Sequence, residues 1–180
     1  MSRIILVLGG ARSGKSRYAE RLALRHRGRK AYIATAEAFD DEMRARIAWH
    51  RQRRGDGWET SEAPLELAGA LAACTADFVL VDCLTVWLGN LLHHGREPEA
   101  EVGLLCDALK QTRMRVVIVS NEVGLGIVPD NPPARAFRDV QGLANQAIAR
   151  LADEVIFMAA GLPMVVKRAR RRPAPARGAG

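Results

Sequence analysis

Short apolar runs alternate along this chain with longer amphipathic stretches. The runs IILVL (4–8), FVLVD (78–82) and VVIVS (116–120) are apolar at successive positions, which is typical of strands buried on both faces of a parallel sheet. Further strands are predicted at KAYIAT (30–35), WETSEA (58–63) and EVIFMAA (154–160), and MVVK (164–167) predicts a returning edge strand.

The stretches between these runs have helical patterns. Residues 15–26 place Tyr18, Ala19, Leu22 and Ala23 on one side, and Gly28 follows as a stop. The other predicted helices cover residues 40–54, 65–73, 84–93, 99–112 and 134–152. Strands separated by helices predict an α/β fold with a mostly parallel sheet flanked by helices. Neither a repeat nor a linker interrupts the pattern, so we expect one domain over residues 1–167.

Length and charge agree with a single globular domain. The chain has 180 residues, of which 48% are hydrophobic, enough for a substantial core. Its formal charge is +7, but the stretch from Lys167 onward contains six basic residues and no acidic ones, so the rest carries only +1. We expect residues 168–180 to be a disordered basic tail. A nearly neutral body makes a nucleic-acid partner unlikely.

The cysteines and the apolar runs indicate the cellular compartment in which the protein is expected. Cys74, Cys83 and Cys106 show no metal-site spacing, so we expect small buried residues in a reducing compartment. The first apolar run is too short for a signal peptide, and the longest apolar region is interrupted by Asp82 and Asn90, which excludes a membrane span. A cytoplasmic protein is expected.

Residues 9–16, GGARSGKS, match the phosphate-binding motif G-x-x-x-x-G-K-[ST] between a predicted strand and a predicted helix. Glycines let successive backbone N–H groups face a phosphate. Lys15 would reach the β- and γ-phosphates, and the Ser16 hydroxyl would ligate Mg²⁺. The alternative is a glycine turn that precedes a helix by chance. The predicted nucleotide-binding residues are Gly9, Gly10, Ala11, Arg12, Ser13, Gly14, Lys15 and Ser16.

Asp82 ends an apolar strand, as expected of the second acid that holds Mg²⁺ in phosphate-loop proteins. It could equally be an aspartate that caps the next helix. The guanine-specific signature N/T-K-x-D is absent from the sequence, and base preference is left open.

The segment RARIAWHRQRR (44–54) holds five arginines and a single histidine. In a helix Arg46, His50, Arg53 and Arg54 share one face. Neighbouring cations lower the pKa of a histidine, which leaves a neutral nitrogen near bound phosphates as a potential nucleophile. A solvated basic helix is the competing interpretation.

Taken together, GGARSGKS, RIAWHRQRR, WETSEAP, VDCLTVWLGNLL, VIVSNEVGLGIVP, ARAFRDVQGLANQ and AAGLPMVVK strongly resemble the bifunctional adenosylcobinamide kinase / adenosylcobinamide-phosphate guanylyltransferase family, over residues 3–167. The resemblance implies a RecA-like P-loop NTPase fold. It implies that the aminopropanol hydroxyl of adenosylcobinamide is phosphorylated with ATP or GTP. GMP then moves from GTP to adenosylcobinamide phosphate through a GMP-histidine intermediate, with release of pyrophosphate.

The resemblance also assigns residues. The guanylylated histidine falls on His50, and Asp82 is the acid near Mg²⁺. Nucleotide contacts beyond the phosphate loop fall on Ala34, Thr35, Ala36, Arg51, Gln52, Arg53, Arg54 and Glu62. Family members are homotrimers, which would let the His50 helix meet a neighbouring subunit.

The loop over residues 120–129 and the three tryptophans each allow more than one interpretation. The loop SNEVGLGIVP (120–129) could be a connection without chemistry, yet Glu122 follows a strand end where α/β folds bind ligands, and could orient the substrate hydroxyl or an Mg²⁺-bound water. Trp49, Trp58 and Trp87 are expected to be packing residues rather than platforms for the corrin ring.

Two alternatives stay open. One is a kinase-only enzyme in which His50 merely helps to bind phosphates. The other is a RecA-like ATPase that binds nucleic acid through the basic tail, which the nearly neutral body argues against.

Overall fold

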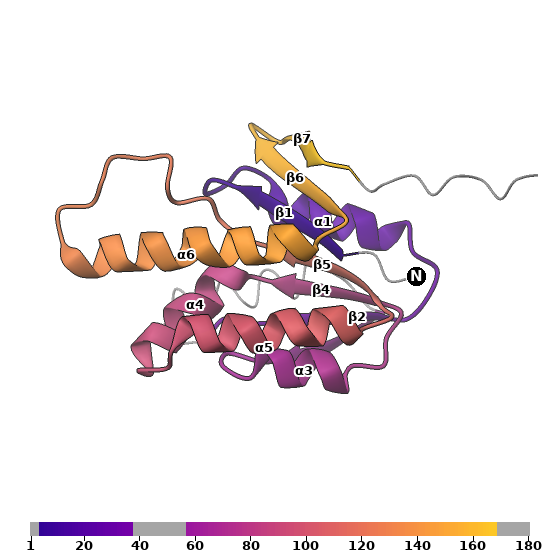
Figure 1. Ribbon diagram of the computed structural model, residues 1–180. Coiled ribbons are helices and arrows are strands. Elements are labelled where there is room, and N and C mark those ends of the chain that lie inside the picture. Colours follow the sequence, from indigo (N-terminus) through magenta and orange to yellow (C-terminus); the bar gives the residue numbers. More distant parts are fainter. Residues whose placement is uncertain (1–3, 38–56, 169–180) are drawn as a thin grey trace, which may run out of the picture.

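The computed structural model describes residues 4–37 and 57–168. In this part of the chain seven strands form one sheet in the order β3-β2-β4-β5-β1-β6-β7 (Figure 1). The strands are β1 (Ile4–Gly9), β2 (Lys30–Ala34), β3 (Trp58–Glu62), β4 (Phe78–Asp82), β5 (Arg115–Val119), β6 (Glu154–Ala159) and β7 (Leu162–Lys167). All pairings are parallel except that of β7 with β6, which is antiparallel. The predicted mostly parallel sheet and returning edge strand are confirmed.

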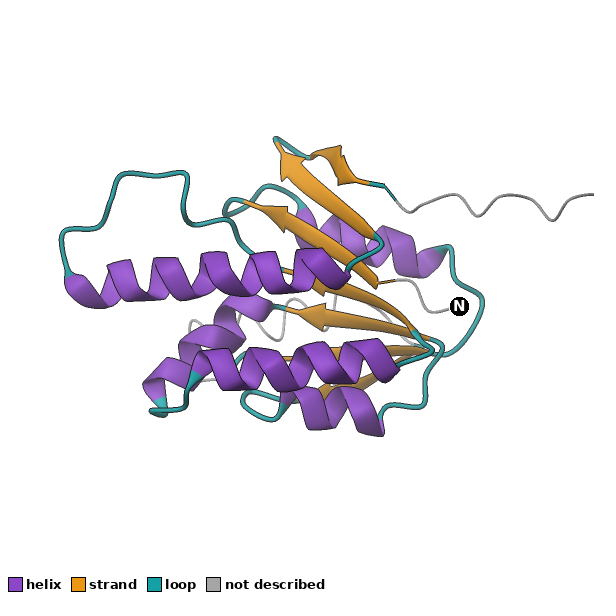
Figure 2. Cartoon of the chain, in the orientation of Figure 1, coloured by secondary structure: helices purple, strands orange, loops and turns teal. Residues whose placement is uncertain are grey.

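Helices cover both faces of the sheet (Figure 2). They are α1 (Lys15–Leu24), α3 (Leu67–Ala73), α4 (Leu84–His93), α5 (Pro98–Gln111) and α6 (Pro132–Leu151). Figure 1 shows α1 on one face and α3, α4, α5 and α6 on the other. The helix predicted over residues 40–54 lies outside the described residues.

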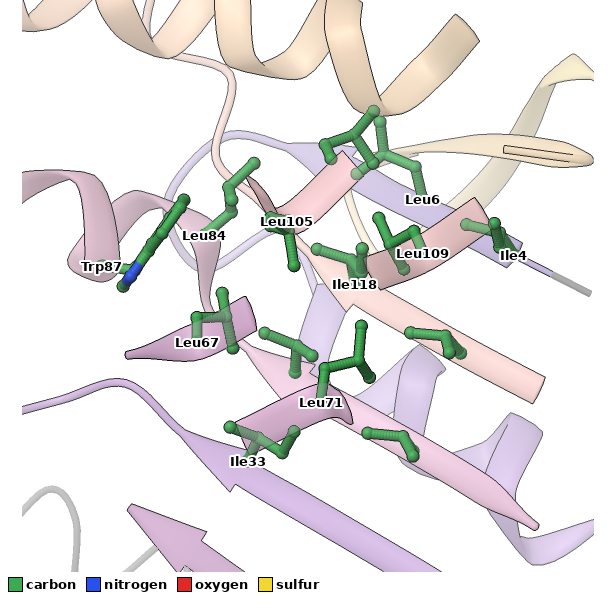
Figure 3. Close-up of a cluster of buried hydrophobic side chains, with 14 of the residues drawn as sticks. Ile4, Leu6, Ile33, Leu67, Leu71, Leu84, Trp87, Leu105, Leu109 and Ile118 are labelled. Atoms are coloured by element: carbon green, nitrogen blue, oxygen red, sulfur yellow. The ribbon is translucent and has the colours of Figure 1, made fainter. Parts of the chain in front are cut away.

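The continuous apolar runs are explained by two cores, one on each face. Along β1, Ile4 and Leu6 enter the cluster under α3 to α6, whereas Ile5 and Val7 enter the cluster under α1. Side chains alternate across a strand, so a strand covered on both faces must be apolar at every position. Figure 3 shows the larger cluster, in which Leu71 and Leu105 pack above the sheet.

Element boundaries differ from the predicted ones by one or two residues, for local reasons. Helix α6 begins two residues early because Pro132 suits the first helical position and the side-chain oxygen of Asn131 accepts a hydrogen bond from the Ala134 N–H at 2.8 Å. Strand β6 ends at Ala159 rather than at Ala160, since Ala160 (φ 49°) and Gly161 (φ 81°) form the tight turn into β7.

The register aligns the carboxyl ends of neighbouring strands. Ala34 at the end of β2 pairs with Glu62 of β3 on one side and with Asp82 of β4 on the other, and Asp82 pairs with Val119 of β5. Parallel strands end at one edge of the sheet, which is where α/β proteins bind ligands. The loops that follow these strands therefore meet at one place.

Other expectations are settled in part. The three cysteines are free, as expected. Each residue as a whole is half-buried rather than buried, although the Cys83 thiol itself is desolvated. The two described tryptophans are packing residues: Trp87 is fully buried and its Nε1–H donates to the Leu65 carbonyl at 2.8 Å, and Trp58 packs edge-on against Tyr32 and Phe78. Trp49 lies outside the described residues. Among the described helices, none has the length and apolar character needed to cross a membrane.

Candidate functional site

The phosphate loop joins β1 to α1 with a backbone that requires glycine at two positions. Gly9 and Gly14 have φ angles of 147° and 96°, which residues with a Cβ rarely adopt. A Cβ on Gly9 would lie 2.5 Å from the carbonyl oxygen of Met158, whereas a Cβ on Gly10 would meet nothing within 4 Å. The contacts within the protein therefore require glycine at position 9 but not at position 10.

Two neighbouring segments hold this loop in place. The Glu122 N–H, just beyond β5, donates to the Gly9 carbonyl at 3.1 Å. The Gly161 N–H, in the turn between β6 and β7, donates to the Ser13 carbonyl at 3.1 Å. The loop is thus fixed from both sides of β1 before any ligand arrives, which is the preorganisation that anion binding by backbone N–H groups needs.

Lys15 begins α1 and is buried, with only 7% of the residue exposed. Its Nζ donates to the Gly10 carbonyl at 2.6 Å. Burial lowers the pKa of this ammonium group, and the nearby Cys83 and Asp82 partly oppose that shift. A buried cation with one carbonyl partner is short of negative charge, so a phosphate beside it would be stabilised.

The polar groups around the loop fit a nucleotide with Mg²⁺. The Ser13 hydroxyl oxygen is buried and has no hydrogen-bond partner among the described residues. Ser16 in the first turn of α1 and Asp82 at the end of β4 offer the hard oxygen ligands that Mg²⁺ prefers. Among the described residues, no group of three His, Cys, Asp or Glu side chains is arranged so that it could hold a metal ion. Mg²⁺ usually keeps waters and substrate phosphates among its ligands, so two protein oxygens are enough to hold it.

Thr35 connects β2 to the segment that carries Asp82. Its Oγ1 donates to the Cys83 carbonyl and accepts from the Cys83 N–H, both at 2.8 Å. The Thr35 N–H donates to the Asp82 carbonyl at 3.3 Å, and the Thr35 carbonyl accepts from Asn90 Nδ2 at 2.7 Å. Thr35 is fully buried, so its polar groups bond within the protein while Ala34 and Ala36 flank it at the sheet edge.

Glu62 ends β3 at the same edge, on the far side of β2 from Asp82. It is exposed, and the following Ala63 N–H donates to the Ala34 carbonyl at 2.8 Å. The structure therefore brings the predicted residues of the phosphate loop, residues 34–36, Glu62 and Asp82 to one edge of the sheet. His50 and the residues Arg51, Gln52, Arg53 and Arg54 lie outside the described residues.

One buried polar cluster at this edge was not predicted from the sequence. Ser120 Oγ donates to Asn145 Oδ1 at 2.7 Å and accepts from Gln141 Nε2 at 2.9 Å. Asn145 Nδ2 in turn donates to the Asn121 carbonyl at 3.0 Å. The available signal was the placement of Gln141 and Asn145 four residues apart on the buried side of α6, which otherwise carries apolar residues. The cluster fixes the backbone just before Glu122.

Glu122 itself lies half-buried at the start of the loop between β5 and α6. Its carboxylate accepts a hydrogen bond from the Gly124 N–H at 2.7 Å. Because its own N–H is bonded to Gly9, the residue is tied directly to the phosphate loop. The structure thus confirms that Glu122 lies at the sheet edge beside the candidate site.

Solved structures similar to this chain share its fold. The RadB recombinase matches with a TM-score of 0.57 and 15% identity, over 95% of this chain and 83% of that one. A prototypical ATPase from a bacterial type III secretion system matches with a TM-score of 0.53 and 11% identity, over 91% of this chain and 56% of that one. At such identities the likeness shows the fold alone, and it confirms the expected RecA-like P-loop architecture.

Sequence comparisons are more specific. The bifunctional adenosylcobalamin biosynthesis protein CobP of Pseudomonas aeruginosa is 48% identical over 166 residues, which cover 90% of this chain and 96% of that protein. The bifunctional adenosylcobalamin biosynthesis protein CobU of Salmonella typhimurium is 40% identical over 181 residues, which cover 91% of this chain and 99% of that protein.

The family model described as cobinamide kinase / cobinamide phosphate guanyltransferase matches residues 5–166. That range includes the whole phosphate loop, Asp82 and every strand of the sheet except the ends of β1 and β7. The chain therefore belongs to the cobinamide kinase / cobinamide phosphate guanyltransferase family.

Proposed function

We propose that this protein catalyses two successive steps of adenosylcobalamin biosynthesis at the carboxyl edge of its sheet. It phosphorylates adenosylcobinamide and then transfers GMP to the resulting phosphate. The observation that carries the proposal is the preorganised phosphate loop, with buried Lys15 beside Asp82, in a chain that matches this family from residue 5 to residue 166.

In the kinase step, the aminopropanol hydroxyl oxygen of adenosylcobinamide attacks the γ-phosphorus of ATP or GTP. The new O–P bond forms as the bond from the γ-phosphorus to the β,γ-bridging oxygen breaks, a nucleoside diphosphate leaves, and the hydroxyl proton passes to solvent. Lys15 and the N–H groups of the phosphate loop hold the phosphates and stabilise charge on the leaving group. Glu122, bonded to Gly9, orients the attacking hydroxyl.

Mg²⁺ fits this site, with the Ser16 hydroxyl and the Asp82 carboxylate as its protein ligands. When bound, it neutralises charge on the phosphate oxygens. Ala34, Ala36 and Glu62 extend the nucleotide contacts along the sheet edge, and Thr35 ties the segment of Ala34 and Ala36 to Cys83.

In the transferase step, a neutral ring nitrogen of His50 attacks the α-phosphorus of GTP and pyrophosphate leaves. A phosphate oxygen of adenosylcobinamide phosphate then attacks the same phosphorus, the N–P bond breaks, and adenosylcobinamide-GDP is released. Arg51, Gln52, Arg53 and Arg54 are proposed nucleotide contacts. His50 and these four residues lie outside the described residues, so the support for their roles is the motif RIAWHRQRR.

A labelling experiment tests the transferase step. The protein is mixed with Mg²⁺ and GTP labelled at the α-phosphate, quenched, and examined for label that is stable in base and released by acid, as a phosphoramidate is. The label should form in the wild type and in His94→Ala, which removes another histidine, 40% exposed in its side chain, and should be lost in His50→Ala.

The result separates the remaining readings. Absence of the adduct in an enzyme that still phosphorylates adenosylcobinamide would leave a kinase-only enzyme. ATP hydrolysis stimulated by a polynucleotide, without phosphorylation of adenosylcobinamide, would favour the nucleic-acid-dependent ATPase.

We further propose that the protein is a homotrimer and that it works in the cytoplasm. Light scattering on the purified protein measures the mass of the oligomer.

A further inference from the structure

The loop between β5 and α6 presents apolar side chains to solvent. Leu125, Ile127 and Val128 are 81%, 98% and 59% exposed. No charged side chain lies between Glu122 and Asp130. We call residues 122–130 the apolar loop; Figure 1 shows it reaching past the end of the sheet beside α6. Exposed apolar residues grouped in this way mark a binding surface.

Both ends of the apolar loop are anchored. At its start, the Glu122 N–H donates to Gly9, and the preceding Asn121 has its N–H bonded to Thr85 Oγ1 at 2.8 Å and its carbonyl bonded to Asn145. At its end, Arg135 Nη1 donates to the Pro129 and Asp130 carbonyls at 3.0 and 2.8 Å. The exposed apolar residues therefore lie between two anchored points of the backbone.

The start of the loop sits at the phosphate loop, which sets how far the apolar residues lie from the reacting groups. Leu125 follows Glu122 by three residues, so the two Cα atoms are at most about 11 Å apart. The hydroxyl that is phosphorylated lies on a short arm of a much larger macrocycle. When the hydroxyl is at Glu122, the body of the substrate rests at the other end of that short arm, within reach of the side chains at the start of the apolar loop.

Resting on the proposed function, we propose that the apolar loop is the docking surface for the corrin macrocycle of adenosylcobinamide. Leu125, Ile127 and Val128 pack against the apolar face of the ring, and Glu122 at the start of the loop receives the arm that carries the hydroxyl. The phosphate loop and the macrocycle site are then joined through a single hydrogen bond, from the Glu122 N–H to Gly9.

A second copy of this chain is the competing occupant, but another surface suits that contact better. On β7, Leu162, Met164, Val165 and Val166 are 68%, 57%, 50% and 67% exposed. In the described part of the chain, β7 has a strand neighbour on one side only. An apolar edge strand offers both side chains and unpaired backbone groups to another subunit. The apolar loop, in contrast, starts inside the candidate site.

Kinase kinetics with two loop variants test the proposal. In Leu125→Ser and Ile127→Ser, the KM for adenosylcobinamide should rise about tenfold or more, the size expected from losing an apolar contact, while the KM for ATP stays within about twofold. The matched control is Leu104→Ser, on α5, which is 57% exposed and should leave both KM values unchanged. Light scattering is measured for all variants.

Unchanged KM values for adenosylcobinamide in both loop variants would overturn the proposal. A loss of oligomer mass in those variants would also overturn it, by assigning the loop to contacts between copies. Failure of the proposed function gives a different result, because the wild-type protein would then not phosphorylate adenosylcobinamide at all.

Discussion

The Thr35 hydroxyl is bonded to both backbone groups of Cys83, its Oγ1 lying 2.8 Å from the Cys83 nitrogen and 2.8 Å from the Cys83 oxygen. Thr35 follows β2, and Cys83 follows Asp82 at the end of β4. This one side chain therefore ties the segment that carries the proposed Mg²⁺ ligand to the neighbouring strand.

We expect Thr35→Val to lower the free energy of unfolding by about 1–3 kcal/mol, because it leaves the Cys83 N–H without a partner, whereas the Cys83 carbonyl keeps its bond from the Trp87 N–H at 3.2 Å. Urea unfolding measures the change. Thr35→Ser keeps the hydroxyl and should lose much less. If Thr35→Val is as stable as the wild type, the two bonds do not support this segment.

Gly9 and Gly10 form a natural pair of matched positions. Gly9→Ala should lower Tm by several degrees, since a Cβ there lies 2.5 Å from the Met158 carbonyl oxygen on a backbone with φ 147°. Gly10→Ala should leave the Tm of the nucleotide-free protein almost unchanged, because its Cβ would meet nothing within 4 Å. Thermal unfolding without nucleotide checks both. Equal losses in the two variants would contradict the geometry of the loop.

The buried polar cluster makes a third prediction. Asn145→Ala removes the acceptor of the Ser120 hydroxyl and the side-chain donor to the Asn121 carbonyl, and we expect it to cost about 1–3 kcal/mol of unfolding free energy and to lower kcat of the kinase step. Gln146→Ala, on the exposed side of the same helix, should change neither. A normal kcat in a destabilised Asn145→Ala would show that the cluster serves stability alone.

Local patterns in the sequence were enough to predict the strands and the phosphate loop. A strand buried on both faces has to be apolar throughout, and the glycines of residues 9–16 stand at fixed spacing, so both signals lie within a few neighbouring residues. The same applies to the end of β4, where Asp82 follows four apolar residues.

What the sequence did not reveal depends on contacts between distant residues. The bond from Gly161 to Ser13 joins the turn before β7 to the phosphate loop, and Gln141 meets Ser120, just after β5, only because α6 packs over the neighbouring strand β1. The strand order brings these segments together, and no local pattern encodes it. Lys15 is a further case, since its motif predicts a phosphate ligand but not its burial or its lowered pKa.

We predict that the Lys15 side chain takes up protons when a nucleotide binds. Burial lowers the pKa of its ammonium group below the ordinary 10.5 in the free protein. Adjacent phosphates favour the charged form and raise that pKa again. In the alkaline range below pH 10.5, binding should therefore take up protons, and affinity should fall as pH rises through the pKa of the free protein.

Calorimetry in buffers of different ionisation enthalpy measures the uptake. Lys15→Arg keeps its charge at these pH values and should bind nucleotide without taking up protons. An uptake of the same size in Lys15→Arg would assign the protons to another group.

Because of Cys83, the free energy of unfolding of the protein should fall as the pH rises in the alkaline range. Desolvation raises the pKa of its thiol from 9.0 to about 11, and the nearby Asp82 adds to the shift. In the unfolded chain the thiol ionises from pH 9 upward, whereas the folded protein retains the proton up to about pH 11. The contribution to stability is thus complete below pH 9 and is lost as pH rises through 11. At about 1.4 kcal/mol per pKa unit, the loss amounts to about 2–3 kcal/mol.

Cys83→Ala and Cys83→Ser lack a group that titrates in this range, so their unfolding free energies should fall less than that of the wild type between these pH values. Urea unfolding at each pH measures the difference, and curves that run parallel for all three proteins would show that the Cys83 thiol is not protected by burial.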